Sequence, residues 1–234
     1  MESNKEYDVL FLSAHPDDTE FGCGGTYLKL ARKYKVAHII LTRGEAGTYG
    51  DPITREKEAI KAAEYAGTTL EFLNFKDNHI ENNAETAKIV AAIIRKYKPK
   101  IIFAPYHTLK STHLDGLTHP DHEALGNIAL KAARFAKFKN AEITGEPHQA
   151  DKIIYYMIPR TLEPNIIIDI SDVKEELIKL WSCHESQLNL AKGKLPSRLL
   201  DFRRIAGEQY GLELAEFFKI QKPIKIKPED LFRI

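Results

Sequence analysis

Residues 8–26 read DVLFLSAHPDDTEFGCGGT and carry the strongest structural signal in the chain. The apolar run Val9–Leu12 predicts a short strand that is buried on both faces. His15, Asp17 and Asp18 follow the end of this strand, and the glycine-containing segment after them leads into an apolar-periodic helix. Open α/β sheets bind ligands at the carboxyl ends of their strands, so we expect the imidazole and the two carboxylates to line a binding site.

An isolated His-Pro-Asp-Asp sequence is also ordinary chemistry for the start of a helix, where carboxylates accept hydrogen bonds from free N–H groups. A second cluster, His119-Pro120-Asp121-His122, also lies between a predicted strand and a predicted helix. Two such clusters are hard to explain as two independent caps. Together they offer His15, Asp18 and His122 as three ligands, which for zinc leaves a position open for water. With Asp17 able to accept a proton, the sequence predicts a metal-dependent hydrolase.

The composition is that of a globular protein, with 43% hydrophobic and 29% charged residues among 234. The net charge of +1 indicates neither nucleic acid nor an anionic membrane as a partner. No segment resembles a signal peptide, and none approaches the roughly 18 apolar residues of a membrane span. Cys23 and Cys183 cannot form a disulfide framework and indicate a reducing compartment. We therefore expect a cytoplasmic protein, with Cys23 as a buried structural thiol.

The chain up to residue 140 alternates predicted strands with predicted helices. Further buried strands are expected at 36–41, 70–73 and 101–104, and helices at 55–66, 84–97 and 123–135. This order predicts an α/β fold: a Rossmann-like, doubly wound, mostly parallel sheet with helices on both faces. The two strands that precede the clusters should then be neighbours beside a topological switch point.

The pattern changes after Phe138. Strands are predicted at 152–157 and 166–170, a long helix from its N-cap Ser171 to about Leu190, a further helix at 199–218, and an edge or contact arm at 223–234. We see no internal repeat and no low-complexity linker. The prediction is one domain over 1–234, with the sheet core and metal site in 1–140 and added strands, helices and tail in 141–234.

Other polar residues on the same rim suggest further roles. His119 can stabilise an oxyanion or protonate a departing amine, and Asp121 can orient one of the two histidines of its cluster. Glu45 follows the end of the second strand and is a candidate for substrate contact. Arg55 lies in the first turn of a predicted helix, where it could also pair with Glu58.

The motifs AHPDDTE, GCGGT and HPDH resemble those of the LmbE-like (PIG-L) family of zinc-dependent N-acetylglucosamine deacetylases. The segments TREKEAIKAAEYAG at 54–67, KDNHI at 76–80, YKPKIIFAPY at 97–106, KIIYYMI at 152–158 and IDISD at 168–172 look like those of the bacillithiol-pathway members, which deacetylate N-acetylglucosaminyl-malate. The resemblance covers nearly the whole chain and implies an LmbE-like fold. It also implies a homo-oligomer, since hexamers and trimers occur in the family.

The resemblance assigns roles to individual residues. It implies one zinc ion, or another divalent ion such as Fe²⁺, on His15, Asp18 and His122. It implies Asp17 as general base and His119 as the electrophilic or acid residue, tuned by Asp121. Arg55 and Asp77 would hold sugar hydroxyls or a carboxylate of the aglycone. These roles describe a hydrolase that removes acetyl from an N-acetylglucosamine-containing small molecule, such as N-acetylglucosaminyl-malate or a chitobiose-type sugar.

The loop STHLDGLTHPDH at 111–122 departs from the bacillithiol-type enzymes by its length. It looks more like the mycothiol-type loop, but Leu117 stands where those enzymes carry a tyrosine, and we interpret His113 as a loop histidine. Two rival functions remain. A metal phosphoesterase would usually need more carboxylates for a second ion. A nucleotide-binding module built on Gly22–Gly25 would lack the GxGxxG spacing and would place two aspartates beside phosphate.

Overall fold

The structure is a computed structural model that describes residues 6–108, 119–188 and 193–221. The first half alternates strands and helices: β1 Val9–Ser13, α1 Asp18–Ala31, β2 Val36–Ile40, α2 Pro52–Ala66, β3 Thr69–Phe72, α3 Ala84–Tyr97, β4 Ile101–Pro105 and α4 Pro120–Ala136. The second half contains β5 Lys152–Tyr156, β6 Ile166–Asp169, the short 3₁₀ helix η1 Ser171–Val173, α5 Lys174–Trp181, α6 Glu185–Leu188, α7 Leu195–Glu208 and β7 Ala215–Ile220.

Within these residues, seven strands form a sheet of order β3-β2-β1-β4-β5-β7-β6. Strands β1 to β5 pair in parallel, and β7 pairs antiparallel with both β5 and β6. The predicted doubly wound, mostly parallel α/β sheet is therefore confirmed. As expected, β1 and β4 are neighbours, so the segments that follow them meet at one edge of the sheet.

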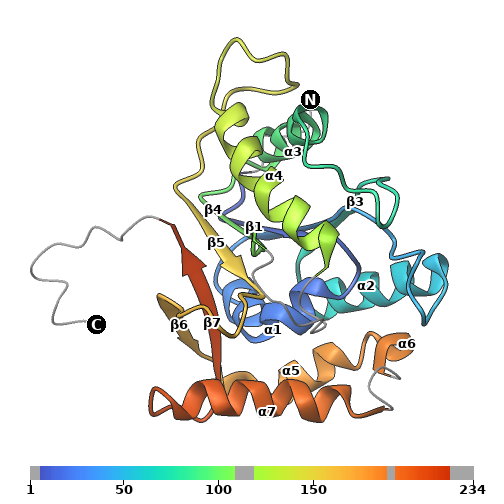
Figure 1. Cartoon of the computed structure of the whole chain (residues 1–234), viewed down its shortest axis with the longest axis vertical. Helices are drawn as coiled ribbons and strands as arrows, with labels where there is room; N and C mark the ends of the chain where they lie inside the picture. Colours follow the sequence, from blue (N-terminus) through green and yellow to red (C-terminus); the bar gives the residue numbers. More distant parts are fainter. Residues whose placement is uncertain (1–5, 109–118, 189–192, 222–234) are drawn as a thin grey trace, which may run out of the picture.

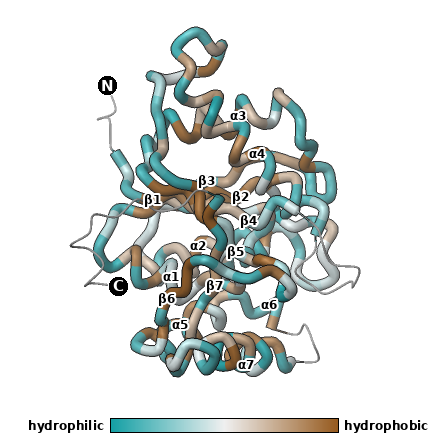
Figure 2. The backbone as a smooth tube through the Cα atoms, turned by 60° about the vertical axis from the view of Figure 1, so that its left-hand side comes forward, coloured by the Kyte–Doolittle hydropathy of each residue, from teal (hydrophilic) through white to brown (hydrophobic). Residues whose placement is uncertain are grey.

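Alternation along β1 builds two hydrophobic cores. Leu10 and Leu12 face one core, which α3 and α4 cover, while Val9 and Phe11 face the other, which α1, α2 and α5 cover. The two helical layers lie on opposite sides of the sheet (Figure 1), and apolar residues gather in the strands between them (Figure 2). Among the described helices, none combines the length and the apolar character needed to cross a bilayer.

The predicted long helix from residue 171 to 190 is wrong as one continuous element. The chain forms η1 and α5, ends α5 at Trp181, and begins α6 only at Glu185. Ser171 does not cap α5, because its Oγ donates to Asp169 Oδ1 and accepts from Leu214 N. The interruption at residues 182–184 turns His184 into the interior, where its side chain is fully buried. In a continuous helix, the 3.6-residue period would fix the direction of the His184 side chain instead.

The predicted helix at 199–218 is also wrong over its second half. Helix α7 ends at Glu208, Gly211 adopts a φ of +72°, and the chain continues as β7. A left-handed residue is not compatible with a continuing α-helix, so the chain turns there. The apolar segment that follows pairs with two strands, and this pairing outweighs its local helix-like pattern.

Candidate functional site

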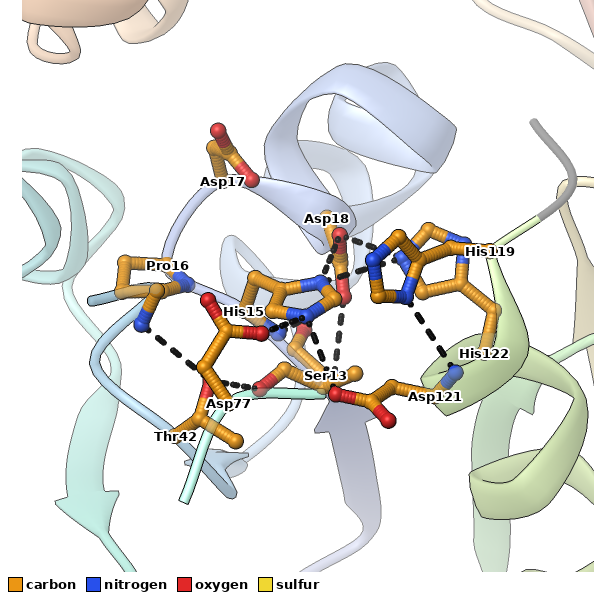
Figure 3. Close-up of polar contacts among 12 residues, drawn as sticks. Ser13, His15, Pro16, Asp17, Asp18, Thr42, Asp77, His119, Asp121 and His122 are labelled. Atoms are coloured by element: carbon orange, nitrogen blue, oxygen red, sulfur yellow. Dashed lines mark hydrogen bonds and ion pairs between the residues drawn. The ribbon is translucent and has the colours of Figure 1, made fainter. Parts of the chain in front are cut away.

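Both polar clusters lie at the carboxyl edge of the sheet. The first fills the connection from β1 to α1, and the second starts α4. Figure 3 shows the imidazoles of His15, His119 and His122 gathered around the carboxylate of Asp18. The two segments are more than a hundred residues apart in the chain, and the pairing of β1 with β4 brings them together.

Helix capping accounts for only part of these clusters. Asp17 occupies the N-cap position of α1, but its side chain makes no capping hydrogen bond. Asp18 Oδ2 instead accepts from the backbone N–H groups of Ala14 and His15, each at 2.8 Å. In the second cluster, His119 does cap α4, since its Nδ1 accepts from Asp121 N at 3.2 Å. The two carboxylates of the first cluster therefore do not cap α1.

His15, Asp18 and His122 present three atoms at the spacing of ligands around one ion. His15 Nδ1 lies 3.3 Å from His122 Nε2 and 3.6 Å from Asp18 Oδ1, while the last two atoms are 3.0 Å apart. Ligands about 2.0–2.2 Å from a tetrahedral zinc ion lie about 3.3–3.6 Å from one another. All three side chains are buried. The donor set therefore fits a small divalent cation.

Two further groupings that could hold an ion share His15, one with His119 and His122 and one with Asp77 and Asp121. The second grouping faces the other ring nitrogen: His15 Nε2 lies 3.1 Å from Asp77 Oδ1 and 3.4 Å from Asp121 Oδ2. Carboxylates in this position orient a histidine ligand and fix which nitrogen faces the ion. An ion held by His15 would therefore bind Nδ1.

The carboxylate of Asp121 is directed at His15 and not at the ring of His119. Its oxygens accept from Asn78 N at 2.8 Å and Ile80 N at 3.3 Å, which fixes its orientation. Its hydrogen bond with His119 involves only the backbone N–H of Asp121. The sequence left open which histidine Asp121 orients, and the resemblance implied His119. The geometry favours His15.

The electrostatics of the cluster are dominated by burial and by close opposite charges. Burial raises the pKa of Asp17 to about 6, although the Arg55 guanidinium lowers it. Burial acts in the same direction on Asp18, but His122 and His15 outweigh it and hold the pKa of Asp18 well below its usual range. Burial and the neighbouring His15 lower the pKa of His119. Two adjacent aspartates thus differ in proton affinity, as a base and a ligand should.

His119 is half-buried, and its ring lies edge-on to that of His15 with centroids 4.6 Å apart. Because Nδ1 accepts the capping hydrogen bond, a neutral His119 carries its proton on Nε2. A neutral imidazole fixed in this tautomer can donate one hydrogen bond to a developing oxyanion.

The three predicted substrate-contact residues lie beside the cluster, and each has protein partners. Asp77 is buried and accepts from Ala46 N through Oδ2, while Glu45 is exposed and accepts from Asp77 N at 2.8 Å. Arg55 is buried against Asp17. The structure thus brings all nine predicted site residues to one edge of the sheet. Leu117 and His113 lie outside the described residues.

Sequence reasoning missed a buried polar group behind the site. Glu20, His38 and His184 are fully buried, and Glu20 Oε1 lies 3.8 Å from His38 Nδ1 and 3.6 Å from His184 Nε2. The only sequence signal was the glutamate that ends AHPDDTE, because His184 is far away in the chain. The rival phosphate cradle also finds no support: Gly24 and Gly25 lie against Leu177 and Ile170, so they permit close packing of the chain.

Comparisons with known proteins show what this chain is similar to. The family described as PIG-L, GlcNAc-PI de-N-acetylase, matches residues 10–133, just over half of the chain. A diacetylchitobiose deacetylase of Thermococcus kodakarensis is 31% identical over 86% of this chain and 80% of its own length. A probable N-acetyl-alpha-D-glucosaminyl L-malate deacetylase 2 of Bacillus anthracis is 26% identical over 68% of this chain and 78% of its own.

A solved structure extends the similarity to the fold. The N,N'-diacetylchitobiose deacetylase of Pyrococcus horikoshii, complexed with its inhibitor MPG, superposes with a TM-score of 0.81. It is 29% identical in sequence, over 92% of this chain and 83% of that one. The likeness therefore includes the added strands and helices of the second half as well as the sheet core.

Proposed function

Because the chain belongs to the PIG-L family of GlcNAc-PI de-N-acetylases, we propose that it is a zinc-dependent hydrolase. Its substrate is a small molecule that contains N-acetylglucosamine, and its products are acetate and the free 2-amino sugar. The observation that carries this proposal is the triangle of His15, Asp18 and His122, whose three facing atoms have the spacing of zinc ligands. The buried Asp17 next to it supplies a base.

Bound by these three side chains, zinc would lower the pKa of a water ligand and polarise the acetyl carbonyl. Asp17 accepts the proton of the attacking water, since its raised pKa brings its proton affinity closer to that of neutral solution. His119 donates a hydrogen bond from Nε2 to the developing oxyanion. The proton that Asp17 accepts can then pass to the departing amine. Asp121 and Asp77 hold the ring of His15 in place.

The sugar's remaining substituent sets the specificity. Relatives named for diacetylchitobiose and for N-acetylglucosaminyl-malate suggest two candidate substrates. Glu45 is the predicted substrate contact that the surface exposes, so we propose it for a sugar hydroxyl. A role in the bacillithiol pathway, a cytoplasmic location, a homo-oligomer and the choice between zinc and iron stay predictions.

Acetate release from N-acetylglucosamine, diacetylchitobiose and N-acetylglucosaminyl-malate tests the proposal. The assay compares metal-stripped protein with protein restored by zinc or by iron(II). We expect metal-dependent release from at least one substrate, and Asp18→Asn should lose both bound metal and activity. If the metal-loaded protein releases no acetate from any of the three substrates, the proposal is contradicted. Hydrolysis of p-nitrophenyl phosphate by that protein would favour the phosphoesterase instead.

A further inference from the structure

We propose that Ser186 and Gln187 in α6 are positioning residues, which fasten the loop at 44–51 so that the substrate groups on this loop stay in place. The inference rests on the proposed function, in which Glu45 contacts the substrate. The two residues of α6 act through the loop and not on the reacting atoms.

The loop at 44–51 joins β2 to α2 and is bonded to the predicted substrate contacts. Glu45 Oε1 accepts from Asp77 N at 2.8 Å, and the backbone N–H after Glu45 donates to Asp77 Oδ2 at 2.9 Å. Gly44 O accepts from Arg55 Nη1 at 2.8 Å. A displacement of the loop would therefore move Glu45 and release partners of Asp77 and Arg55 at the same time.

This loop has little burial to hold it. Residues 45–51 are exposed, and segments with few buried contacts open at a low cost in free energy. Asp51 fixes one end of the loop, because its carboxylate caps α2. In the middle, Gln187 Nε2 donates to Tyr49 O at 2.7 Å. Among the residues that the structure describes, no other side chain forms a hydrogen bond with residues 47–50. The middle of the loop is therefore held by Gln187.

Helix α6 is a fixed point for this contact, since it lies beside α2 (Figure 1) and is bonded to it. Ser186 donates to both carboxylate oxygens of Glu58 on α2, from its N–H at 2.6 Å and from Oγ at 2.7 Å. Ser186 Oγ also accepts from Gln187 Nε2 at 2.9 Å, which orients that amide. Gln187 is only 5% exposed, and the preceding turn places His184 fully buried against the ring of Phe21. Hydrogen bonds to a carboxylate are stronger than neutral ones, so the amide reaches the loop from a rigid position.

The loop also passes very close to Ser186. A Cβ at Gly50 would lie 2.6 Å from Ser186 Oγ. Gly50 adopts a φ of +74°, which favours glycine. The absence of a side chain at Gly50 lets the loop approach α6 closely enough for Tyr49 O to reach Gln187. The shape of the loop and the donor on α6 are thus matched to each other.

Gln187→Met tests the proposal, because methionine is similar in size and lacks the donor. The loss of one hydrogen bond changes an equilibrium by about two- to tenfold. We expect KM to rise by about three- to tenfold, for diacetylchitobiose or N-acetylglucosaminyl-malate, whichever the wild type deacetylates. Bound substrate restores the closed loop, so kcat should stay within about twofold of wild type. Amide hydrogen exchange of residues 44–51 should accelerate by a factor similar to the rise in KM, and this readout needs no activity.

Glu185→Ala is the matched control. Glu185 is in the same helix and also pairs with α2, but its bond to Lys61 Nζ, at 2.9 Å, lies at the surface with side chains 72% and 59% exposed. It should change neither KM nor the exchange of residues 44–51. Ser186→Ala should act in the same direction as Gln187→Met. The double variant should cost less than the product of the two single losses, because both residues act through one contact.

Several outcomes would overturn the proposal. Unchanged exchange over residues 44–51 in Gln187→Met would show that α6 does not hold the loop. Faster exchange with an unchanged KM, or a lower Tm as the sole effect, would leave Gln187 a purely structural role. If Gln187→Met does not fold, Ser186→Ala carries the same measurements. A wild-type protein that releases no acetate refutes the proposed function alone, and the exchange measurement still decides whether α6 holds the loop.

Discussion

Replacing Glu216 by alanine removes the carboxylate that ties β7 to the helix bearing Asp18. Helix α1 is kinked at Cys23, whose φ of −151° and ψ of 36° are not helical. The second half of α1 therefore begins with N–H groups that have no acceptor within the helix. Glu216 accepts two of them, Gly25 N at 3.0 Å and Thr26 N at 2.8 Å, and so caps the helix from another strand.

The magnitude follows from burial and from the remaining partner. Glu216 is 4% exposed and Arg203 is 6% exposed. Glu216 Oε1 accepts a hydrogen bond from Arg203 Nε at 3.2 Å. Removing one partner of a buried ion pair costs about 3–5 kcal/mol, because the other charge stays buried. The bonds from Arg203 to Leu199 O and Phe21 O remain and keep the cost within this range. At about 2–4 °C per kcal/mol for a chain of this size, Glu216→Ala should lower Tm by roughly 10 °C.

Thermal melting and urea unfolding measure this effect. Glu216→Gln keeps one acceptor oxygen and should cost about 1–3 kcal/mol, because a buried N–H donor loses its acceptor. Glu213→Ala is the control, because that carboxylate pairs with Lys174 at the surface, with its side chain 60% exposed, and should not change Tm measurably. A Glu216→Ala protein that melts within 2 °C of wild type would refute the proposed capping and pairing.

Three further predictions concern other buried groups. Asp17→Asn should lower kcat by about 10²–10⁴-fold while the metal content of the protein is unchanged, and loss of metal would make Asp17 a ligand instead. Arg95→Met should lower the free energy of unfolding in urea by about 2–4 kcal/mol, because four backbone carbonyls lose the same guanidinium. Burial disfavours charge on Glu20, but His38 and His184 hold its pKa below 4.5, so its stabilisation is lost as pH falls through the folded-state pKa. Burial likewise disfavours charge on His184, but Glu20 raises its pKa above 6.5, so that stabilisation is lost as pH rises through the folded-state pKa. The Tm difference between wild type and Glu20→Gln should therefore be largest between pH 4.5 and 6.5, and a difference that is constant with pH would contradict this.

The parallel half of the fold was predictable because its signals are local. A strand buried on both faces is a short apolar run, and the helices between such strands have their own period and stops. The two clusters could be placed at one edge of the sheet for the same reason: each follows a strand, and parallel strands end on the same side. The candidate ligands His15, Asp18 and His122 needed no knowledge of tertiary structure.

The second half was predicted less well because its decisive contacts are not local. The residues of β7 have a pattern compatible with a helix, and only pairing with β5 and β6 makes them a strand. The break before α6 similarly depends on where His184 is buried. Local propensity is worth tenths of a kcal/mol per residue, so pairing and burial of this kind override it.

The amino-acid sequence by itself determined the chemistry of the site: which residue types stand at the ends of which strands, and hence a candidate metal-binding hydrolase. The tertiary structure decided the partners of those residues. Arg55 meets Asp17 across 38 positions and Asp121 meets His15 across 106, while Glu216 caps α1 from the far end of the chain. Hydrogen bonds and ion pairs act over a few ångströms in space and are independent of distance along the chain, so only the folded arrangement of the sheet could assign them.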